Sequence, residues 1–298
     1  MIKNILFAVI LLLPVPAWSA ETLQLIRTAF ITSDAAGVKI KQPEGVGCRG
    51  KSTLAVSDTA NGRIQLFSLH EDGTIKPGVE IKVPYPLHVR LNSKGEILAL
   101  DGKQRRIVAL SASGASLGYF ELKEMPDAAA WIPKNFAIDV DDNVYILDVF
   151  SARVIVAGHD GKFLKQLGLP VADGFFSDVT VDPQGTIYLL NSVNATIYSA
   201  AKNAVVFTPL TKGLKEHVAF PTTIIADNKF IFLVDQNGSA VVVLGKDGSF
   251  KGRKLRMGWK NGELQYPSDI CLNDRGQVFV ADRGNNLVEV YKMESGRE

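Results

Sequence analysis

The stretch YPSDICLNDRGQVFVADRGNNLVEVYKMESG, from Tyr266 to Gly296, contains the pattern that decides the fold. It begins with a short apolar strand (DICLN), turns through residues rich in Gly, Asn and Asp, and continues into an apolar strand that ends in Asp (FVAD). A second turn leads to a third strand, LVEVY. Short strands joined by tight turns, without helical periodicity, predict an antiparallel sheet.

The same pattern recurs through the chain. An apolar strand ending in Asp or Asn appears as LAVSD, ILALD, YILD, YLLN, FLVD and FVAD, and the final residues are Asp58, Asp101, Asp148, Asn191, Asp235 and Asp282. These residues are 43 to 47 positions apart, which is the length of a four-stranded propeller blade. The sequence therefore predicts an all-β fold, a six-bladed β-propeller of four-stranded antiparallel blades, as a single domain over residues 21–298.

The two ends of the chain predict how the ring closes. The third strand of the last unit is expected to end at Tyr291, which leaves too little chain for a fourth strand. An extra strand, Thr22 to Ile31, precedes the first unit. Because an unpaired edge strand invites aggregation, we expect this N-terminal strand to pair with the last unit and close the propeller.

The stretch from Tyr266 to Gly296 resembles the NHL repeat almost position for position. The stretch WIPKNFAIDVDDNVYILDVFSARVIVAGHDG, from Trp131 to Gly161, is the next-best copy, and the other four units are looser. The resemblance covers nearly all of the chain after residue 20 and implies an NHL-repeat six-bladed propeller. It implies a fold and not an activity, because propellers host unrelated functions.

The first twenty residues have the pattern of a secretory signal peptide. They contain a positive charge at Lys3, an apolar run from Ile5 to Val15, and small residues at Ala17, Ser19 and Ala20. The run is shorter than a membrane span and is broken by two prolines. We therefore expect a cleaved signal over residues 1–20, a periplasmic or secreted protein, and no membrane-spanning segment.

Composition narrows the classes of partner. The chain has 298 residues, of which 46% are hydrophobic and 21% charged, and a formal net charge of +2. Such a near-neutral chain with scattered basic residues does not suit nucleic-acid binding, which needs a concentrated basic face. The densest basic cluster is Lys251, Arg253, Lys254 and Arg256, whose alternation is typical of a solvated strand edge.

One position in the first strand of each unit carries a polar residue where the NHL pattern usually has glycine. In units two to six it is occupied by His88, Asn135, Asp178, Thr223 and Asp269. In unit one, Glu44 and Gly45 are both near the equivalent position. Innermost strands line the central channel of a propeller and begin at one mouth. We therefore predict that these side chains form a ligand-binding ring at the channel mouth.

The same ring is a candidate metal site. Oxygen ligands suit calcium, and a histidine widens the choice to zinc or manganese. Resemblance to propellers of the gluconolactonase and paraoxonase kind implies a calcium site at the mouth, for which the candidate ligands here are Glu44, Asn135, Asp178 and Asp269. The alternative is that these residues are solvated strand starts without a bound ion.

Three further patterns in the sequence could indicate a zinc site, a nucleotide site or a disulfide bond. Only one of the four histidines, His88, occupies a ring position, so the zinc site of an NHL-type peptidyl-hydroxyglycine lyase is not expected. Residues 45–52 (GVGCRGKS) match the P-loop pattern, but a strand follows them instead of the required helix, which predicts a turn. Cys48 and Cys271 lie in the first strands of the first and last units and are candidates for a disulfide across the closure.

These observations favour a binding module or scaffold that recognises a protein, peptide or glycan outside the cytoplasm, because no nucleophile, base and orienting group can be assembled. The alternative is a metal-dependent hydrolase or lyase, of the lactonase or esterase kind, with its site at the channel mouth. A third hypothesis is a structural subunit of an envelope assembly. We expect a monomer that binds no nucleic acid.

Overall fold

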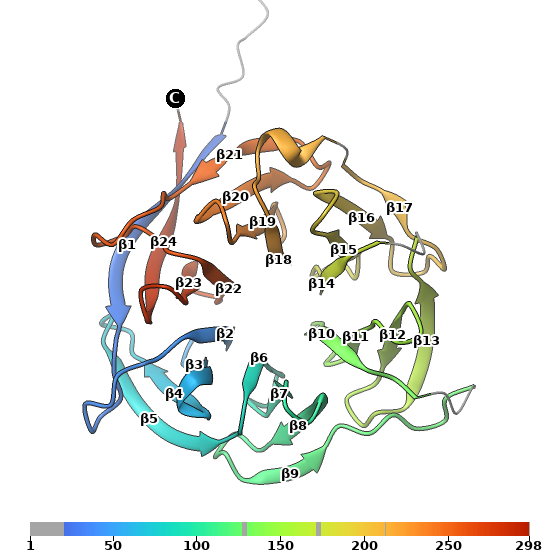
Figure 1. Ribbon diagram of the computed structural model, residues 1–298, viewed down its shortest axis with the longest axis horizontal. Coiled ribbons are helices and arrows are strands. Elements are labelled where there is room, and N and C mark those ends of the chain that lie inside the picture. The colour runs from blue at the N-terminus through green and yellow to red at the C-terminus, as the bar shows by residue number, and fades with distance from the viewer. Residues whose placement is uncertain (1–20, 127–129, 171–173, 212, 298) are drawn as a thin grey trace, which may run out of the picture.

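Six four-stranded antiparallel sheets surround a central axis like the blades of a propeller (Figure 1). The computed structural model describes residues 21–126, 130–170, 174–211 and 213–297. The expected signal peptide, residues 1–20, lies outside these residues. No helix within the described ranges is long and apolar enough to cross a membrane. The predicted six-bladed, all-β architecture is therefore confirmed.

Each blade has four strands, ordered from the innermost strand at the central channel to the outermost strand at the rim. The innermost strands are β2 (Pro43–Arg49), β6 (Pro86–Leu91), β10 (Pro133–Ile138), β14 (Phe176–Val181), β18 (Pro221–Ala226) and β22 (Pro267–Leu272). The second strands are β3 (Thr53–Asp58), β7 (Ile97–Asp101), β11 (Val144–Asp148), β15 (Ile187–Asn191), β19 (Phe230–Asp235) and β23 (Gln277–Asp282). The third strands are β4 (Arg63–Leu69), β8 (Arg106–Leu110), β12 (Arg153–Ala157), β16 (Thr196–Ala200), β20 (Ala240–Gly245) and β24 (Leu287–Arg297). The outermost strands are β5 (Ile75–Lys82), β9 (Ser116–Tyr119), β13 (Phe163–Gly168), β17 (Thr208–Pro209), β21 (Phe250–Lys254) and β1 (Glu21–Ile31). Short 3-10 turns occur at Thr59–Asn61 and Leu214–Glu216.

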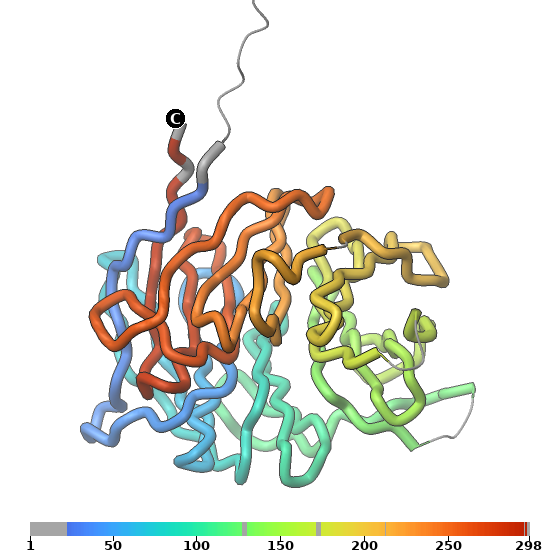
Figure 2. The backbone as a smooth tube through the Cα atoms, turned by 45° about the horizontal axis from the view of Figure 1, so that its top comes forward, coloured from blue at the N-terminus to red at the C-terminus, as the bar shows by residue number. Residues whose placement is uncertain are grey.

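The sixth blade combines the two ends of the chain. Its strand order is β1-β24-β23-β22, so the N-terminal strand supplies the outer edge as predicted. Figure 2 shows β1 and β24 running side by side out of the blade. The expected end of the last third strand at Tyr291 was wrong, because β24 continues to Arg297. This extension follows from the pairing, which runs from Ile31↔Val288 to Glu21↔Arg297.

The hydrophobic core consists of six clusters, each packed between two neighbouring blades. Between the first and last blades, for example, Val46 and Leu54 pack against Phe279 and Val290, and all four are fully buried. Apolar strands buried on both faces explain why the repeat appears in the sequence as continuous apolar runs instead of a polar alternation.

The Asp that ends each second strand has a structural role. Asp235 is fully buried, and its carboxylate accepts hydrogen bonds from the Ala219 and Phe220 backbone N–H groups, which lead into the innermost strand of the same blade. Arg253 on the outermost strand pairs with the same carboxylate at 2.7 Å. In four of the six blades, this Asp therefore fixes the connection into the innermost strand, where the buried carboxylate needs such partners.

Every innermost strand contains a β-bulge directly after its first residue. The register shifts in all six blades, and the bulged residues are Glu44, Leu87, Lys134, Ser177, Thr222 and Ser268. The next residue in the first blade is Gly45, which is therefore the equivalent of the predicted ring positions. The predicted turn over residues 45–52 was wrong for residues 45–49, which belong to strand β2, and only residues 50–52 form the turn before β3. A strand and not a helix follows them, so they do not form a P-loop.

Candidate functional site at the channel mouth

The five predicted ring residues lie on the innermost strands of blades two to six, immediately after each bulge. The first blade contributes Gly45. A Cβ atom at this position would come within 2.7 Å of the Leu87 carbonyl oxygen of the second blade. Glycine is therefore required at this close approach of the first two blades, and a sixth polar side chain cannot complete the ring.

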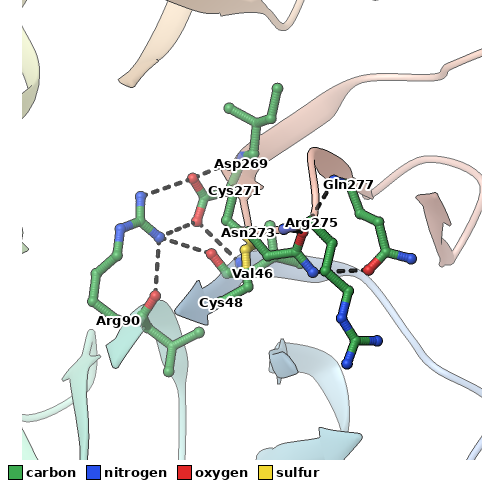
Figure 3. The surroundings of a disulfide bond; sticks show 10 residues. Val46, Cys48, Arg90, Asp269, Cys271, Asn273, Arg275 and Gln277 are labelled. Carbon is green, nitrogen blue, oxygen red and sulfur yellow. Dashed lines mark hydrogen bonds and ion pairs between the residues drawn. A yellow bond between two sulfur atoms is a disulfide. The ribbon is translucent and has the colours of Figure 1, made fainter. Parts of the chain in front are cut away.

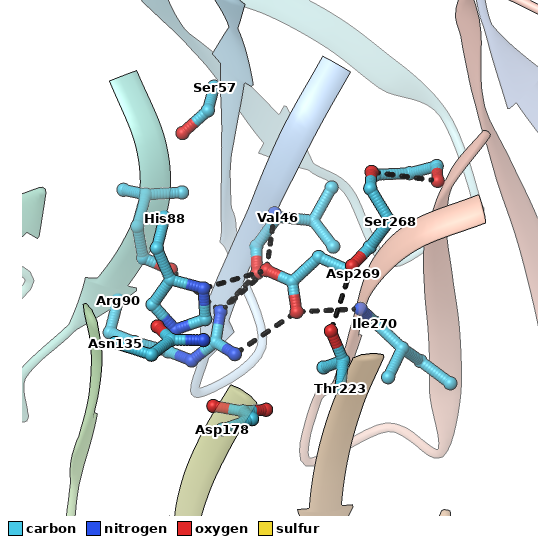
Figure 4. A network of polar contacts seen from close by, with 12 residues as sticks. Val46, Ser57, His88, Arg90, Asn135, Asp178, Thr223, Ser268, Asp269 and Ile270 are labelled. Carbon is cyan, nitrogen blue, oxygen red and sulfur yellow. Dashed lines mark hydrogen bonds and ion pairs between the residues drawn. The ribbon is translucent and has the colours of Figure 1, made fainter. Parts of the chain in front are cut away.

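The ring side chains join neighbouring blades through hydrogen bonds (Figure 4). Two of these bonds run from a backbone N–H to a ring carboxylate of a neighbouring blade: Ile224 N–H donates to Asp178 Oδ2 at 2.8 Å, and Val46 N–H donates to Asp269 Oδ2 at 3.0 Å. The Thr223 hydroxyl donates to the carbonyl oxygen of Ser268 at 2.8 Å. His88 Nε2 lies 3.1 Å from the Phe136 carbonyl oxygen, so this nitrogen carries a proton. Asn135 instead accepts the Phe136 N–H of its own blade. The ring side chains therefore help to hold neighbouring blades together.

Arg90 completes this network, and the sequence analysis missed it. It lies on β6, two residues beyond His88, and its guanidinium contacts Asp269 at 2.9 and 3.1 Å. It also donates to the Val46 carbonyl oxygen at 2.8 Å, so it spans the second, first and sixth blades. The signal was present in the sequence as a charged residue inside an innermost strand, PLHVRL, two positions after the ring histidine.

Burial gives the ring unusual electrostatics. Loss of hydration raises the pKa of Asp178 to about 8, although Arg90 and two backbone N–H groups oppose this shift. Burial, together with the nearby Arg90 charge, lowers the pKa of His88 to about 3. Burial alone would raise the pKa of Asp269, but Arg90 and the hydrogen bonds outweigh it and hold that pKa below its usual value. At neutral pH the network therefore contains one ion pair, a neutral imidazole and a protonated carboxyl group.

A cavity of about 310 Å³ opens above this network. All six blades line it, through the bulged residues, three ring residues and nearby side chains: Glu44, Leu87, His88, Leu100, Lys134, Asn135, Phe175, Ser177, Phe220, Thr222, Thr223, Gln236 and Ser268. The Phe175 and Phe220 rings are 6.4 Å apart, and Lys134 Nζ lies 5.9 Å from the Phe175 ring. The cavity therefore combines aromatic surface, hydroxyl and amide groups, and a basic edge.

Exposed apolar side chains surround the same mouth. They stand just before an innermost strand or just after a second strand, positions that the sheet register places at one end of the blades: Tyr85, Val149, Phe150, Phe175, Val193 and Tyr266. Phe150 is 62% exposed and Phe175 is 50% exposed. Large apolar side chains grouped on one face are typical of a binding surface.

The predicted metal ligands do not gather into one group. Glu44 lies at the mouth and pairs with Arg283 at 2.8 Å, whereas both oxygens of Asp178 and of Asp269 accept hydrogen bonds. Among the described residues, no group of three or more His, Cys, Asp and Glu side chains is placed to hold a metal ion. The metal site therefore stays a prediction.

The other histidines lie away from the ring. His70 and His159 are in turns after third strands, at the end of the blades opposite the mouth. His217 is on an outer connection, where its ring stacks on Phe250 with the centroids 3.9 Å apart.

A disulfide bond joins Cys48 on β2 to Cys271 on β22, with the Cα atoms 5.9 Å apart (Figure 3). It links the innermost strands of the first and last blades. Figure 3 shows Arg90 and Asp269 beside this bond, so a covalent link and an ion pair fasten the same closure.

Comparison with known proteins agrees with this architecture. The model of the NHL repeat matches residues 264–291, which comprise the innermost, second and part of the third strand of the last blade. This chain is a six-bladed propeller that contains an NHL repeat. No curated protein matches its sequence.

Solved structures similar to this NHL-repeat propeller have different functions. Virginiamycin B lyase from Staphylococcus aureus is 15% identical with a TM-score of 0.62, and the match covers 91% of this chain and 99% of the lyase. A gluconolactonase from Xanthomonas campestris is 12% identical with a TM-score of 0.63, covering 91% and 97%. A chain of a nidogen–laminin complex is 15% identical with a TM-score of 0.57, covering 79% and 93%. At these identities the likeness shows a shared fold alone.

Proposed function

We propose that this NHL-repeat propeller is an exported binding module that recognises a protein, peptide or glycan at its channel mouth. The observation that carries the proposal is the cavity to which all six blades contribute, together with the exposed aromatic side chains around it. Ligand sites in proteins are typically concave, with aromatic walls and a few placed polar groups. Export is proposed from the signal-like residues 1–20.

The size and chemistry of the cavity suggest how a ligand is held. A volume of about 310 Å³ is at the lower end for ligand pockets, so it suits one side chain or one sugar ring of a larger partner. Thr222 Oγ1 is a buried atom without a hydrogen-bond partner in the described structure. Phe175 offers its ring face to such a ligand.

Selection of ligands from a displayed peptide library and a glycan array tests this proposal. The Phe175→Ser variant should lose binding at least about tenfold, because an exposed aromatic anchor typically contributes more than 1 kcal/mol to an interface. The matched control is Val206→Ser, which removes a similarly exposed apolar side chain at the opposite end of the blades. Equal binding by the two variants, or no selected ligand, would contradict the proposal.

The second candidate is a hydrolase or lyase with its site at the mouth. Asp178 favours it, because burial raises the pKa of this ring carboxyl group to about 8, and strongly shifted groups are typical of active sites. Similarity in fold to a virginiamycin B lyase and a gluconolactonase also motivates it. Elemental analysis of the wild type and the Asp178→Ala and Asp269→Ala variants separates the hypotheses. Stoichiometric metal in the wild type that is lost in either variant would support the enzyme hypothesis. A wild type without metal and without lactonase or esterase activity would reject that hypothesis.

A further inference from the structure

The connection between β21 and β22, residues 255–266, displays a tryptophan that the propeller itself does not use. Trp259 is 79% exposed and the neighbouring Met257 is 57% exposed. Exposing such large apolar side chains to water is unfavourable unless another surface covers them. The connection lies at the outer side of the last two blades, in orange beside β1 in Figures 1 and 2.

The connection is held rigidly, so the exposure is a fixed feature. Gly258 N–H donates to the Leu264 carbonyl oxygen at 3.0 Å, and Leu264 N–H donates to the Arg256 carbonyl oxygen at 2.9 Å. Leu264 itself is fully buried in the core between the last two blades. Trp259 therefore stands on a stable base and needs little ordering to bind.

The charge around this tryptophan is one-sided. Residues 251–266 contain five basic residues and a single acidic one, in a chain whose total net charge is only +2. Arg253 and Arg256 are neutralised by Asp235 and Glu263. Lys254 and Lys260 have no ion-pair partner among the described residues, and they flank the exposed Trp259 and Met257. The patch thus carries a net positive charge beside an apolar tip.

We propose that residues 254–260 dock this protein on an anionic phospholipid surface. Tryptophan prefers the headgroup region, because its ring is apolar and its N–H needs a polar partner. Each lysine near a negatively charged bilayer adds about 1 kcal/mol of attraction. Two such lysines beside a fixed tryptophan match this chemistry, and the attachment is peripheral and reversible. This inference does not depend on the proposed function.

Vesicle binding by residues 21–298 tests the proposal. Sedimentation is measured with phosphatidylcholine vesicles and with vesicles containing about 30 mol% phosphatidylglycerol, at about 0.1 M salt, where surface charges still interact over roughly 10 Å. We expect binding to the anionic vesicles only, at least about tenfold weaker for Trp259→Ser and for the double variant Lys254→Gln/Lys260→Gln. The Val206→Ser variant is the control and should bind like the wild type.

Fluorescence gives a second readout. In the Trp131→Phe variant, Trp259 is the one tryptophan that residues 21–298 retain, and its emission should shift to shorter wavelength on anionic vesicles. The absence of both sedimentation and shift would overturn the proposal. Equal binding to neutral vesicles, or full binding by the Trp259→Ser variant, would also overturn it.

Discussion

Asp178 illustrates how the position of a single residue sets its chemistry. Its carboxyl group is almost fully buried on an innermost strand, where the Val179 and Ile224 N–H groups donate to it at 2.8 Å. These bonds stabilise the charged form, yet desolvation outweighs them and raises the pKa to about 8. The residue therefore fastens the fourth blade to the fifth as a neutral acid.

Replacing Asp178 with Asn should change how stability depends on pH. An unfolded Asp titrates near 3.9, so between about pH 4 and 8 the unfolded chain releases a proton that the native state keeps. The free energy of unfolding of the wild type therefore decreases as the pH rises through this range, and it stops decreasing above pH 8. The Asp178→Asn variant loses one acceptor but cannot titrate, so its free energy of unfolding should improve relative to the wild type by at least about 2 kcal/mol across the range.

Chemical denaturation at several pH values measures this difference. The exposed Asp72→Asn variant is the control, because the pKa of Asp72 is lowered by its hydrogen bonds to Thr74 and that residue is already ionised above pH 5. A pH-independent difference for the Asp178→Asn variant would show that this carboxyl group titrates normally.

Residue-level prediction from sequence succeeded where the repeat provided a register. The ring positions His88 to Asp269 could be aligned because each lies four residues before the Asp or Asn that precedes a turn. Gly45 could not be separated from Glu44, since the first unit has two glycines that obscure its pattern. Arg90 was missed because its partners, Val46 and Asp269, come from blades that are distant in sequence and meet only in the closed ring.

At the level of elements, the bulge in each innermost strand creates the mouth. Its extra residue adds a second side chain beside the ring position, and in the third blade these two residues are Lys134 and Asn135. A proline begins five of the six strands, at the point where the bulge disrupts the ladder. Period-2 alternation does not reveal such a bulge, so the sequence predicted the ring and not the cavity above it.

The disulfide is the covalent link between two innermost strands. Cys48 and Cys271 are 223 residues apart, so the bond closes a very long loop in the unfolded chain. The Cys48→Ala/Cys271→Ala variant should lose about 2 to 5 kcal/mol of stability under oxidising conditions. It should still fold, because β1 and β24 also close the ring.

Urea unfolding of the double variant and the wild type provides the measurement, with the reduced wild type as control. The reduced protein should behave like the double variant. Unfolding midpoints that coincide for the oxidised wild type and the variant would show that the disulfide does not stabilise this closure.

At the scale of the whole molecule, the chain is a ring whose two ends share one blade. This closure was predictable, because the last unit lacks a fourth strand and the chain begins with an orphan strand. The observed β1 pairs along the full length of β24 and places Leu23 and Ile31 in the cores on either side of the sixth blade. Function was less predictable, because the mouth is assembled from six separate stretches of sequence.

Deleting residues 21–31 should produce aggregated protein. The deletion uncovers the edge of β24 and removes two core side chains, so both backbone groups and apolar surface become exposed. Size-exclusion chromatography with light scattering measures the outcome, and a chain that lacks only residues 1–20 is the control. A folded monomer after the deletion would show that β1 is dispensable for closure.

The central claim, that the channel mouth is the binding face, is tested most directly by hydrogen exchange with the selected peptide or glycan. Exchange of backbone amides is followed by mass spectrometry in the free and bound protein. The account predicts that binding slows exchange in the segments that enter the mouth, around Leu87, Asn135, Phe175 and Thr222. Protection confined to the outermost strands, or to the turns at the opposite end that include Val206, would contradict it.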